Sequence, residues 1–269
     1  MALRSRPSKI VVLVAVVGAL VTWYARRDGV DAHPAPIPKE TREALKPVQS
    51  PSVERPGRAR FDFYLLAMSV HSAFCADGHS RMAECAVRAP RPLVIHGLWP
   101  EDLQPGAYPH DCPTAALDLA PALAAELEAY MPGMRADLHE HEWRKHGGCT
   151  GLDDDVYWRD ALALARVLDE ALAVKLTTSA GQEVNARELR NAADAFRPGL
   201  GATLVFQCRT LRNAPAEQRK RAFLIEVRQC VDDDGPDGAP GTPLDCATVK
   251  RRDQGCGGTF MIAGAKPWK

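Results

Sequence analysis

Several features are missing from this chain of 269 residues, and each absence narrows what it can be. Its 34 Lys and Arg balance 34 Asp and Glu, which argues against a protein that coats a long polyanion, because such binding needs excess basic charge. No apolar run reaches the roughly 20 residues that span a bilayer. No Cys-x-x-Cys pair is present, so the spacing of a structural zinc site is absent. No internal repeat is apparent.

The balanced charge is divided unevenly along the chain. Residues 1–60 carry 11 Lys and Arg against 5 Asp and Glu, a net charge of +6. The remaining residues carry 23 against 29, a net charge of −6. An acidic folded part predicts weak capture and rapid release of a polyanion, although a local cationic pocket can sit on such a surface.

The first 60 residues show two segments of different composition. A basic start is followed by an apolar run over residues 10–24, which suits the hydrophobic region of a signal peptide; an uncleaved N-terminal membrane anchor is the alternative for residues 1–32. Residues 33–60 are rich in Pro and charge, and we interpret them as a flexible linker. Either interpretation predicts export, to the periplasm or the exterior, of one domain over residues 61–269.

Two short segments contain histidines beside other reactive groups: V-I-H-G-L-W-P at 94–100 and H-E-W-R-K-H-G-G-C at 141–149. A helix over residues 136–147, at about 100° per residue, would gather four ionisable side chains on one face. The Trp143 ring would pack inward at the edge of that face, and Arg144 would point to solvent. The four side chains of the face are His141, Glu142, Lys145 and His146.

A zinc hydrolase is the main competing interpretation, because His-Glu on a helix is similar to the H-E-x-x-H motif. Here the spacing is H-E-x-x-x-H, and an i, i+5 pair diverges by about 140°, so His141 and His146 cannot easily share one zinc ion. A solvated helix with ordinary surface charges is the other alternative. It leaves unexplained the Gly-Gly-Cys that follows the helix and the histidine at position 96, which we place at the end of a strand.

The two segments match, at every defined position, the two active-site motifs of the ribonuclease T2 family, H-G-L-W-P and H-E-W-x-K-H-G-x-C. Further similar segments follow the family order at residues 61–75, 108–112, 224–230 and 255–260, so the resemblance covers residues 61–264 and is strongest to the bacterial periplasmic members. One departure is His71, where relatives often have Trp. It weakens any inference about base selectivity.

The resemblance implies a metal-independent endoribonuclease that needs no cofactor and cleaves single-stranded RNA with low base specificity. The 2′-hydroxyl of the RNA would attack phosphorus to form a 2′,3′-cyclic phosphate, which is then opened to a 3′-phosphate. DNA lacks this hydroxyl and would not be cleaved. His96 and His146 would be the acid and base, with His146 favoured as the first base. Glu142 and Lys145 would stabilise the transition state. A catalytically silent RNA-binding relative remains an alternative, and we expect a monomer.

Two more residues are candidates for substrate contact. Protonated His141 would help to hold the phosphate, unless it is an ordinary surface histidine. Trp99 would stack on a base, since aromatic faces bind the splayed bases of single-stranded RNA, unless it serves only core packing.

Eight cysteines lie beyond residue 74, an even number that favours disulfides in an oxidising compartment. Their spacing alone does not choose among the many pairings. The family resemblance implies four bonds, which are Cys75 with Cys85, Cys112 with Cys149, Cys208 with Cys256, and Cys230 with Cys246.

The order of elements predicts an α+β fold with a mainly antiparallel sheet packed against several helices, because strands and helices do not alternate regularly. Asp153 would cap a long helix, and Asn185 with Glu188 a short one. We expect Tyr64, Trp158 and Phe206 in the core. The expected strands are 61–70, 93–96, 202–208, 222–230 and 259–263, and the expected helices are 114–130, 136–147 and 153–176.

Overall fold

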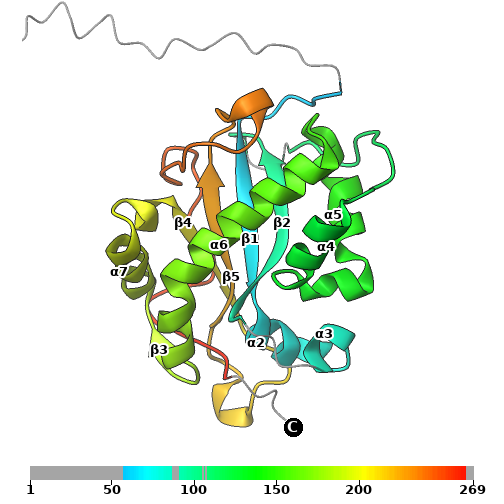
Figure 1. The fold of residues 1–269 in the computed structure, drawn as a ribbon. Helices are drawn as coiled ribbons and strands as arrows, with labels where there is room; N and C mark the ends of the chain where they lie inside the picture. Colours follow the sequence, from blue (N-terminus) through cyan, green and yellow to red (C-terminus); the bar gives the residue numbers. More distant parts are fainter. Residues whose placement is uncertain (1–56, 87–90, 105, 107, 265–269) are drawn as a thin grey trace, which may run out of the picture. The chain divides into compact units, whose positions relative to one another are not determined.

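The computed structural model describes residues 57–86, 91–104, 106 and 108–264 (Figure 1). The predictions for residues 1–32 and 33–56 therefore lie outside the described residues. Residues 57–60, at the end of the expected linker, contact the domain: the Ala59 N–H donates to the Cys149 carbonyl at 2.9 Å, and Arg58 pairs with Asp233. Within the described ranges, no helix combines the length and apolar character that crossing a membrane requires.

The sheet is mainly antiparallel, as predicted. Strand β1 (Phe63–Val70) pairs antiparallel with β2 (Leu93–Glu101) and with β5 (Phe223–Val231), which also pairs antiparallel with β4 (Leu204–Arg209). The short strands β3 (Glu183–Val184) and β6 (Phe260–Met261) extend the sheet, and β6 meets β5 in the one parallel pairing of the described strands. The α+β fold class is therefore confirmed.

Strand β2 is longer than the sequence predicts, and it contains a bulge. It continues to Glu101, so the whole first motif lies within it. Its register to β1 shifts between Ala67, which pairs with Gly97, and Met68, which pairs with Ile95. His96 therefore has no partner in the ladder and lies inside the strand rather than at its end. A bulge at this point re-aims one side chain, and here that side chain is an imidazole.

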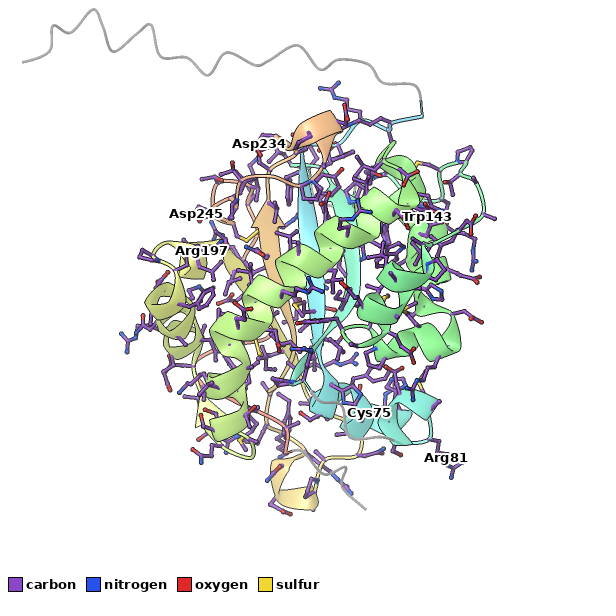
Figure 2. The ribbon with its side chains drawn as sticks, viewed as in Figure 1. Cys75, Arg81, Trp143, Arg197, Asp234 and Asp245 are labelled. Carbon is purple, nitrogen blue, oxygen red and sulfur yellow. A yellow bond between two sulfur atoms is a disulfide. The ribbon has the colours of Figure 1, made fainter. Side chains whose placement is uncertain are left out.

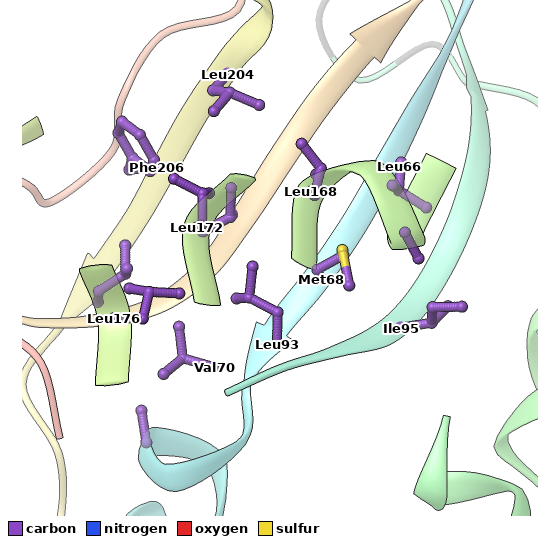
Figure 3. Packing of buried hydrophobic residues seen from close by; sticks show 14 of the residues in the cluster. Leu66, Met68, Val70, Leu93, Ile95, Leu168, Leu172, Leu176, Leu204 and Phe206 are labelled. Carbon is purple, nitrogen blue, oxygen red and sulfur yellow. The ribbon is translucent and has the colours of Figure 1, made fainter. Parts of the chain in front are cut away.

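One face of the sheet is covered by α6 (Asp154–Thr178), which crosses β1 and β5 in Figure 1. The Asp153 side chain accepts a hydrogen bond from the Asp155 N–H at 3.1 Å, which confirms the predicted cap. The apolar stripe of α6 packs onto the sheet, as seen around Leu168, Leu172 and Leu176 in Figure 3. Tyr64, Trp158 and Phe206 are fully buried, as expected.

The remaining helices surround this layer. They are α2 (His71–Phe74), the π-helical turn Cys75–His79, α3 (Ala83–Ala86), α4 (Pro121–Glu128), α5 (Leu138–Lys145) and α7 (Ala186–Phe196). Asn185 caps α7 by accepting from the Glu188 N–H, as predicted. The expected helix 114–130 is wrong in its first half. Pro121 is the first residue of α4, and the residue before a proline is driven into extended backbone, so Ala120 adopts φ −54° and ψ 131°.

Short 3-10 turns connect these elements: Pro132–Ala136, Gly147–Cys149, Leu200–Thr203, Ala216–Gln218 and Pro236–Gly238.

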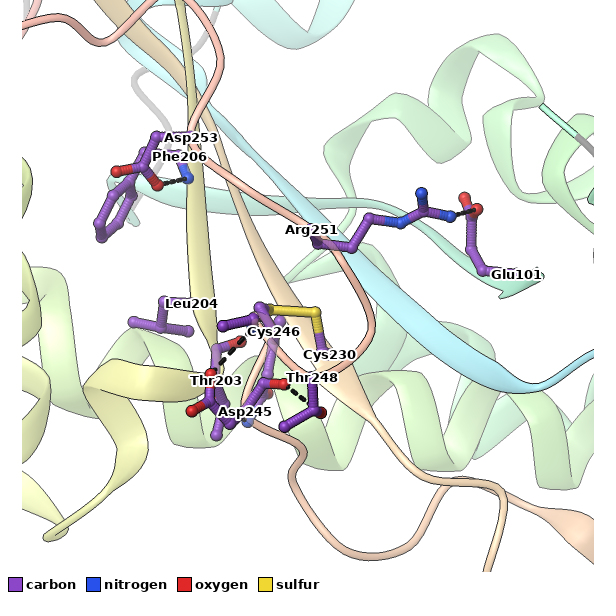
Figure 4. Close-up of a disulfide and its surroundings, with 12 residues drawn as sticks. Glu101, Thr203, Leu204, Phe206, Cys230, Asp245, Cys246, Thr248, Arg251 and Asp253 are labelled. Atoms are coloured by element: carbon purple, nitrogen blue, oxygen red, sulfur yellow. Dashed lines mark hydrogen bonds and ion pairs between the residues drawn. A yellow bond between two sulfur atoms is a disulfide. The ribbon is translucent and has the colours of Figure 1, made fainter. Parts of the chain in front are cut away.

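The opposite face of the sheet carries a smaller apolar cluster and a covering segment. Phe63, Leu65, Val205, Cys230, Cys246 and Val249 form the cluster, and Trp99 packs against it. The segment around Cys246 is held by its disulfide to Cys230 and by the ion pair between Arg251 and Glu101, 2.5 Å apart (Figure 4). This covering leaves the rest of the face, beside Trp99, for polar side chains.

All eight cysteines are paired as the resemblance implies. The bonds are Cys75–Cys85, Cys112–Cys149, Cys208–Cys256 and Cys230–Cys246. The second of these fixes the loop that follows β2 to the turn that follows α5. It therefore braces the two segments that carry the motifs.

Candidate active site

Helix α5 is shorter than predicted, and its end determines where His146 lies. The helix begins after Asp137, whose backbone is left-handed at φ 57°, and it ends at Lys145. His146 caps it with φ −124° and ψ −49°, outside the helical region, and its Nε2 lies 3.9 Å from the Glu142 carboxylate. A Cβ on Gly147 would lie 2.2 Å from the Trp143 ring, so only glycine allows the chain to turn this closely over the buried Trp143 (Figure 2).

Glu142 is the centre of the site. Its carboxylate lies 3.8 Å from His96 Nε2, 4.0 Å from His141 Nε2 and 3.9 Å from His146 Nε2. The Trp99 indole N–H donates to the same carboxylate at 2.8 Å. The structure thus brings both motifs together at one buried carboxylate, although they are separated by 40 residues or more in sequence.

Lys145 is half-buried and lies at the side of this group. Among the described residues, no carboxylate oxygen lies within 4.0 Å of its ammonium, although its positive charge acts on Asp111 and on His146. The Asp111 N–H donates to the Lys145 carbonyl at 2.8 Å, which anchors the loop beside the helix end. The ammonium is therefore free to meet an incoming anion.

Gly97 allows β2 to approach α5 this closely. A Cβ at Gly97 would lie 2.2 Å from a Glu142 oxygen and 2.5 Å from Trp99 Nε1, so any side chain here would displace the central carboxylate. On the other side of the strand, the Tyr157 hydroxyl donates to the Leu98 carbonyl at 2.5 Å. The strand is therefore fixed to α6 next to the residue that contacts Glu142.

Sequence reasoning missed two charged residues of this site, Glu226 and Arg228. His96 Nδ1 lies 2.8 Å from Glu226 Oε1, and the Arg228 Nε–H donates to Glu226 Oε2 at 2.5 Å. The guanidinium also lies 5.0 Å over the Trp99 ring. Alternation along β5 indicates that the two side chains share a face, but it does not indicate that this face meets the motifs.

The surroundings of His96 favour its charged form. Burial alone would lower the pKa of His96, but the hydrogen bond and negative charge of Glu226, together with the charge of Glu142, raise it above its usual value; Arg228 opposes them. The same contacts hold the pKa of Glu226 below its usual range in spite of burial. The imidazole side chain is 38% exposed, so solutes can reach it.

The surroundings of His146 favour its neutral form. Burial and the nearby charges of Lys145, His96 and His141 lower its pKa to about 3. Its ring is enclosed by Trp99 at 5.5 Å and Tyr108 at 5.9 Å between ring centroids. Its Nδ1 is buried without a hydrogen-bond partner among the described residues. The surroundings of the two imidazoles therefore shift their pKa values in opposite directions.

The expected alternative of a zinc site on α5 gains no support from the geometry. In the part of the chain that the structure describes, the one group of three His, Cys, Asp or Glu ligand atoms within 4.8 Å of one another is His71, Cys75 and Cys85. The two sulfurs of that group are bonded to each other. His141 and His146 do not join a third ligand in this way.

Known proteins share this arrangement of sequence and fold. The model of the ribonuclease T2 family matches residues 61–239. A ribonuclease of Aeromonas hydrophila is 30% identical over 198 residues, covering 72% of this chain and 82% of the relative. The extracellular ribonuclease LE of Solanum lycopersicum is 25% identical over 209 residues, covering 70% of this chain and 87% of the relative. A variant of RNase MC1 from bitter gourd seeds, solved with 5′-GMP, is 25% identical with a TM-score of 0.59, covering 75% of this chain and 100% of that chain. The chain therefore belongs to the ribonuclease T2 family and is an endoribonuclease.

Proposed function

We propose that the domain cleaves single-stranded RNA without a metal, with His146 as the first base and His96 as the first acid. The observation that carries this proposal is the pair of imidazoles at 3.8 and 3.9 Å from the Glu142 carboxylate, with opposite pKa shifts. An acid and a base on one scissile linkage each contribute about 10² to 10⁴ in rate. The pair therefore suits a reaction in which one group must lose a proton and another must gain one.

In the first step, His146 takes the proton of the 2′-hydroxyl, and its oxygen attacks phosphorus. The bond to the 5′ oxygen breaks, and His96 gives its proton to that leaving oxygen. The 2′,3′-cyclic phosphate that forms is opened in a second step. His96 takes a proton from water, and the water oxygen bonds to phosphorus. The bond from phosphorus to the 2′ oxygen breaks, and His146 protonates that oxygen. Both imidazoles return to their starting states, and a 3′-phosphate remains.

The other residues of the site act on charge and orientation. The Lys145 ammonium stabilises the negative charge that develops on the phosphoryl oxygens, and His141 helps to hold the phosphate. Phosphate binding also places a negative charge beside His146, which raises its proton affinity as the reaction requires. Glu142 orients the imidazoles and the Trp99 indole, whose N–H it accepts. Trp99, which also contacts Arg228 and His146, would stack on a base of the substrate with low base specificity.

We further propose that the protein works as an exported monomer whose catalytic domain is residues 61–269. Four disulfides support an oxidising compartment, such as the periplasm or the exterior. The tomato relative is named extracellular, which agrees with this location. The basic and apolar residues 1–32 would supply the signal peptide or anchor.

Mass spectrometry of the products from a short defined RNA tests the reaction directly. We expect strand scission, a transient cyclic phosphate and then a 3′-phosphate, with EDTA without effect and the matching DNA uncut. His96→Ala and His146→Ala should each lose about 10²-fold or more in kcat. His79→Ala is the matched control, since His79 stacks on Phe74 outside the site. Unchanged hydrolysis in both site variants would eliminate the mechanism.

A further inference from the structure

We propose that Glu226 is a positioning residue of this reaction, which holds the His96 imidazole by Nδ1 and so presents Nε2 to the scissile linkage. The inference rests on the proposed function, because it gives His96 a partner rather than a new task. Nothing in either motif contains Glu226, which lies on β5, 130 residues after His96.

The contact is built for fixed geometry. Glu226 Oε1 lies 2.8 Å from His96 Nδ1, and Oε2 accepts from Arg228 Nε at 2.5 Å, so both carboxylate oxygens are engaged. Glu226 is 6% exposed. Its strand is central, with β1 on one side and β4 on the other. A carboxylate held at both oxygens on such a strand cannot turn away from the imidazole.

His96 needs this support more than an ordinary strand residue does. The bulge in β2 leaves His96 without a partner in the ladder to β1. Its side chain is also more exposed than those of its neighbours Glu142 and Glu226. The bond to Glu226 therefore supplies the orientation that regular pairing does not.

The same bond selects the useful tautomer. An imidazole that donates Nδ1–H to a carboxylate keeps Nε2 for its exchange partner. After His96 has protonated the leaving oxygen, it is neutral with the hydrogen on Nδ1, and its bare Nε2 is ready to take a proton from water. A catalytic histidine whose carboxylate partner is changed to an amide loses about 10⁴ in kcat in serine proteases, largely through the wrong tautomer.

Among the described residues, four charged or titratable groups face His96, and Glu226 is the one hydrogen-bonded to it. Glu226 and Glu142 raise the pKa of His96, Arg228 lowers it, and the neutral His146 completes the set. Removing the Glu226 charge must therefore lower the pKa of His96. Because the first acid has to be protonated, the alkaline limb of kcat/KM should move to lower pH.

Glu226→Gln tests the inference with a side chain of the same shape. We expect kcat on a short RNA to fall at least about tenfold, with a smaller change in KM. The alkaline limb should move to lower pH while the acid limb, set by His146, stays in place. Titration of the His96 ring signals by NMR should show the same downward shift. A role in packing alone would move neither the limb nor the ring signals.

Glu183→Gln is the matched control, because it makes the same change at an exposed residue of β3, away from the site. If Glu226→Gln does not fold, Glu226→Asp gives the same test, since its shorter carboxylate weakens the bond and must move the alkaline limb in the same direction. An unmoved limb in the folded variant overturns the inference, even if kcat falls. The proposed function is judged separately, by whether His96→Ala and His146→Ala both keep unchanged RNA hydrolysis.

Discussion

At the scale of single residues, neighbouring charges divide the work between two identical side chains. His146 is buried among cationic groups, and its pKa falls to about 3; His96 shares two carboxylates, and its pKa rises above the usual value near 6.5. Each histidine would titrate near the same pH in water. In the proposed mechanism, the roles of base and acid thus follow from what surrounds each ring rather than from its identity.

This division predicts a broad pH optimum that extends far to the acid side. The neutral base is lost only as pH falls through about 3, and the protonated acid is lost as pH rises through the raised value of His96. We therefore expect kcat/KM on a short RNA to be nearly constant from about pH 4 to pH 6. Circular dichroism at each pH would separate unfolding from titration. An acid limb near pH 6 to 7 would contradict the depressed pKa of His146.

Gly97 tests how closely β2 and α5 must approach. In Gly97→Ala the new Cβ would lie 2.2 Å from a Glu142 oxygen, so the carboxylate must move. We expect a loss of about a hundredfold in kcat, the scale of a displacement of about 1 Å at a catalytic group. The free energy of unfolding, measured in urea, should fall by about 1 to 3 kcal/mol.

Gly257→Ala is the control for this change, since a Cβ there meets no atom within 4 Å. It should leave both kcat and the urea midpoint near those of the unchanged protein. A Gly97→Ala protein with full activity would show that catalysis does not depend on the present position of the Glu142 carboxylate.

At the scale of elements, the end of α5 is held from outside the helix. The helix has 8 residues, too few to be stable alone, and its final turn leads through His146 to the buried Cys149. Two contacts fix that end. Cys149 is bonded to Cys112, and the Trp143 ring packs against the Tyr157 ring with 5.6 Å between the ring centroids. The placement of His146 therefore depends on tertiary contacts rather than on the propensity of α5.

Removing the Cys112–Cys149 bond should therefore reduce both stability and activity. With a sequence separation of 37 between the two cysteines, loop entropy assigns the bond about 4 kcal/mol. A Cys112→Ala, Cys149→Ala protein should unfold at lower urea and lose at least about tenfold in kcat through the freed His146.

The Cys75–Cys85 bond offers the comparison, since it spans 10 residues and about 3 kcal/mol by the same argument. Its removal should lower stability while kcat of the folded fraction changes little. Equal losses of kcat in the two double variants would argue against a special role of the Cys112–Cys149 bond in catalysis.

Element by element, the sequence predicts best where local signals are strong. The caps Asp153 and Asn185 and the long apolar stripe fix α6 and α7, and both are found as predicted. Two predicted helices are too long: α4 begins only at Pro121, and α5 ends at Lys145. In both places local backbone preferences, which the apolar pattern does not report, decide where the helix begins or ends. The bulge at His96 has no signal in one strand, because it exists only in the register with β1.

The residues of the site also differ in how well the sequence predicts them. The motifs identify the residues around Glu142, since each motif is contiguous in sequence. Glu226 and Arg228 enter from a distant strand, and only the pairing of β1 with β5 brings them beside β2. Long-range register depends on the whole sheet, and it is therefore the part of the site that a single sequence hides.

At the scale of the whole molecule, charge should limit how RNA is held. The chain beyond residue 60 has a net charge of −6, so in the proposed mechanism we expect phosphate to be met chiefly by groups of the site itself, which are Lys145, His141 and protonated His96. Such a surface offers few phosphate contacts outside the scissile linkage. Catalysis then depends on local positioning rather than on tight capture of the polymer.

The dependence of RNA binding on salt measures the number of these contacts. Each phosphate neutralised on a single strand contributes about −0.7 to the slope of log affinity against log salt. Two or three contacts predict a slope of about −1.5 to −2, and this slope should be the same for an RNA of 4 nucleotides as for one of 20. Binding to the inactive His146→Ala protein, measured by fluorescence anisotropy between about 50 and 200 mM NaCl, provides the comparison. A slope that steepens with RNA length would reveal a cationic track beyond the site, and the basic residues 1–60 would be the first place to look by truncation.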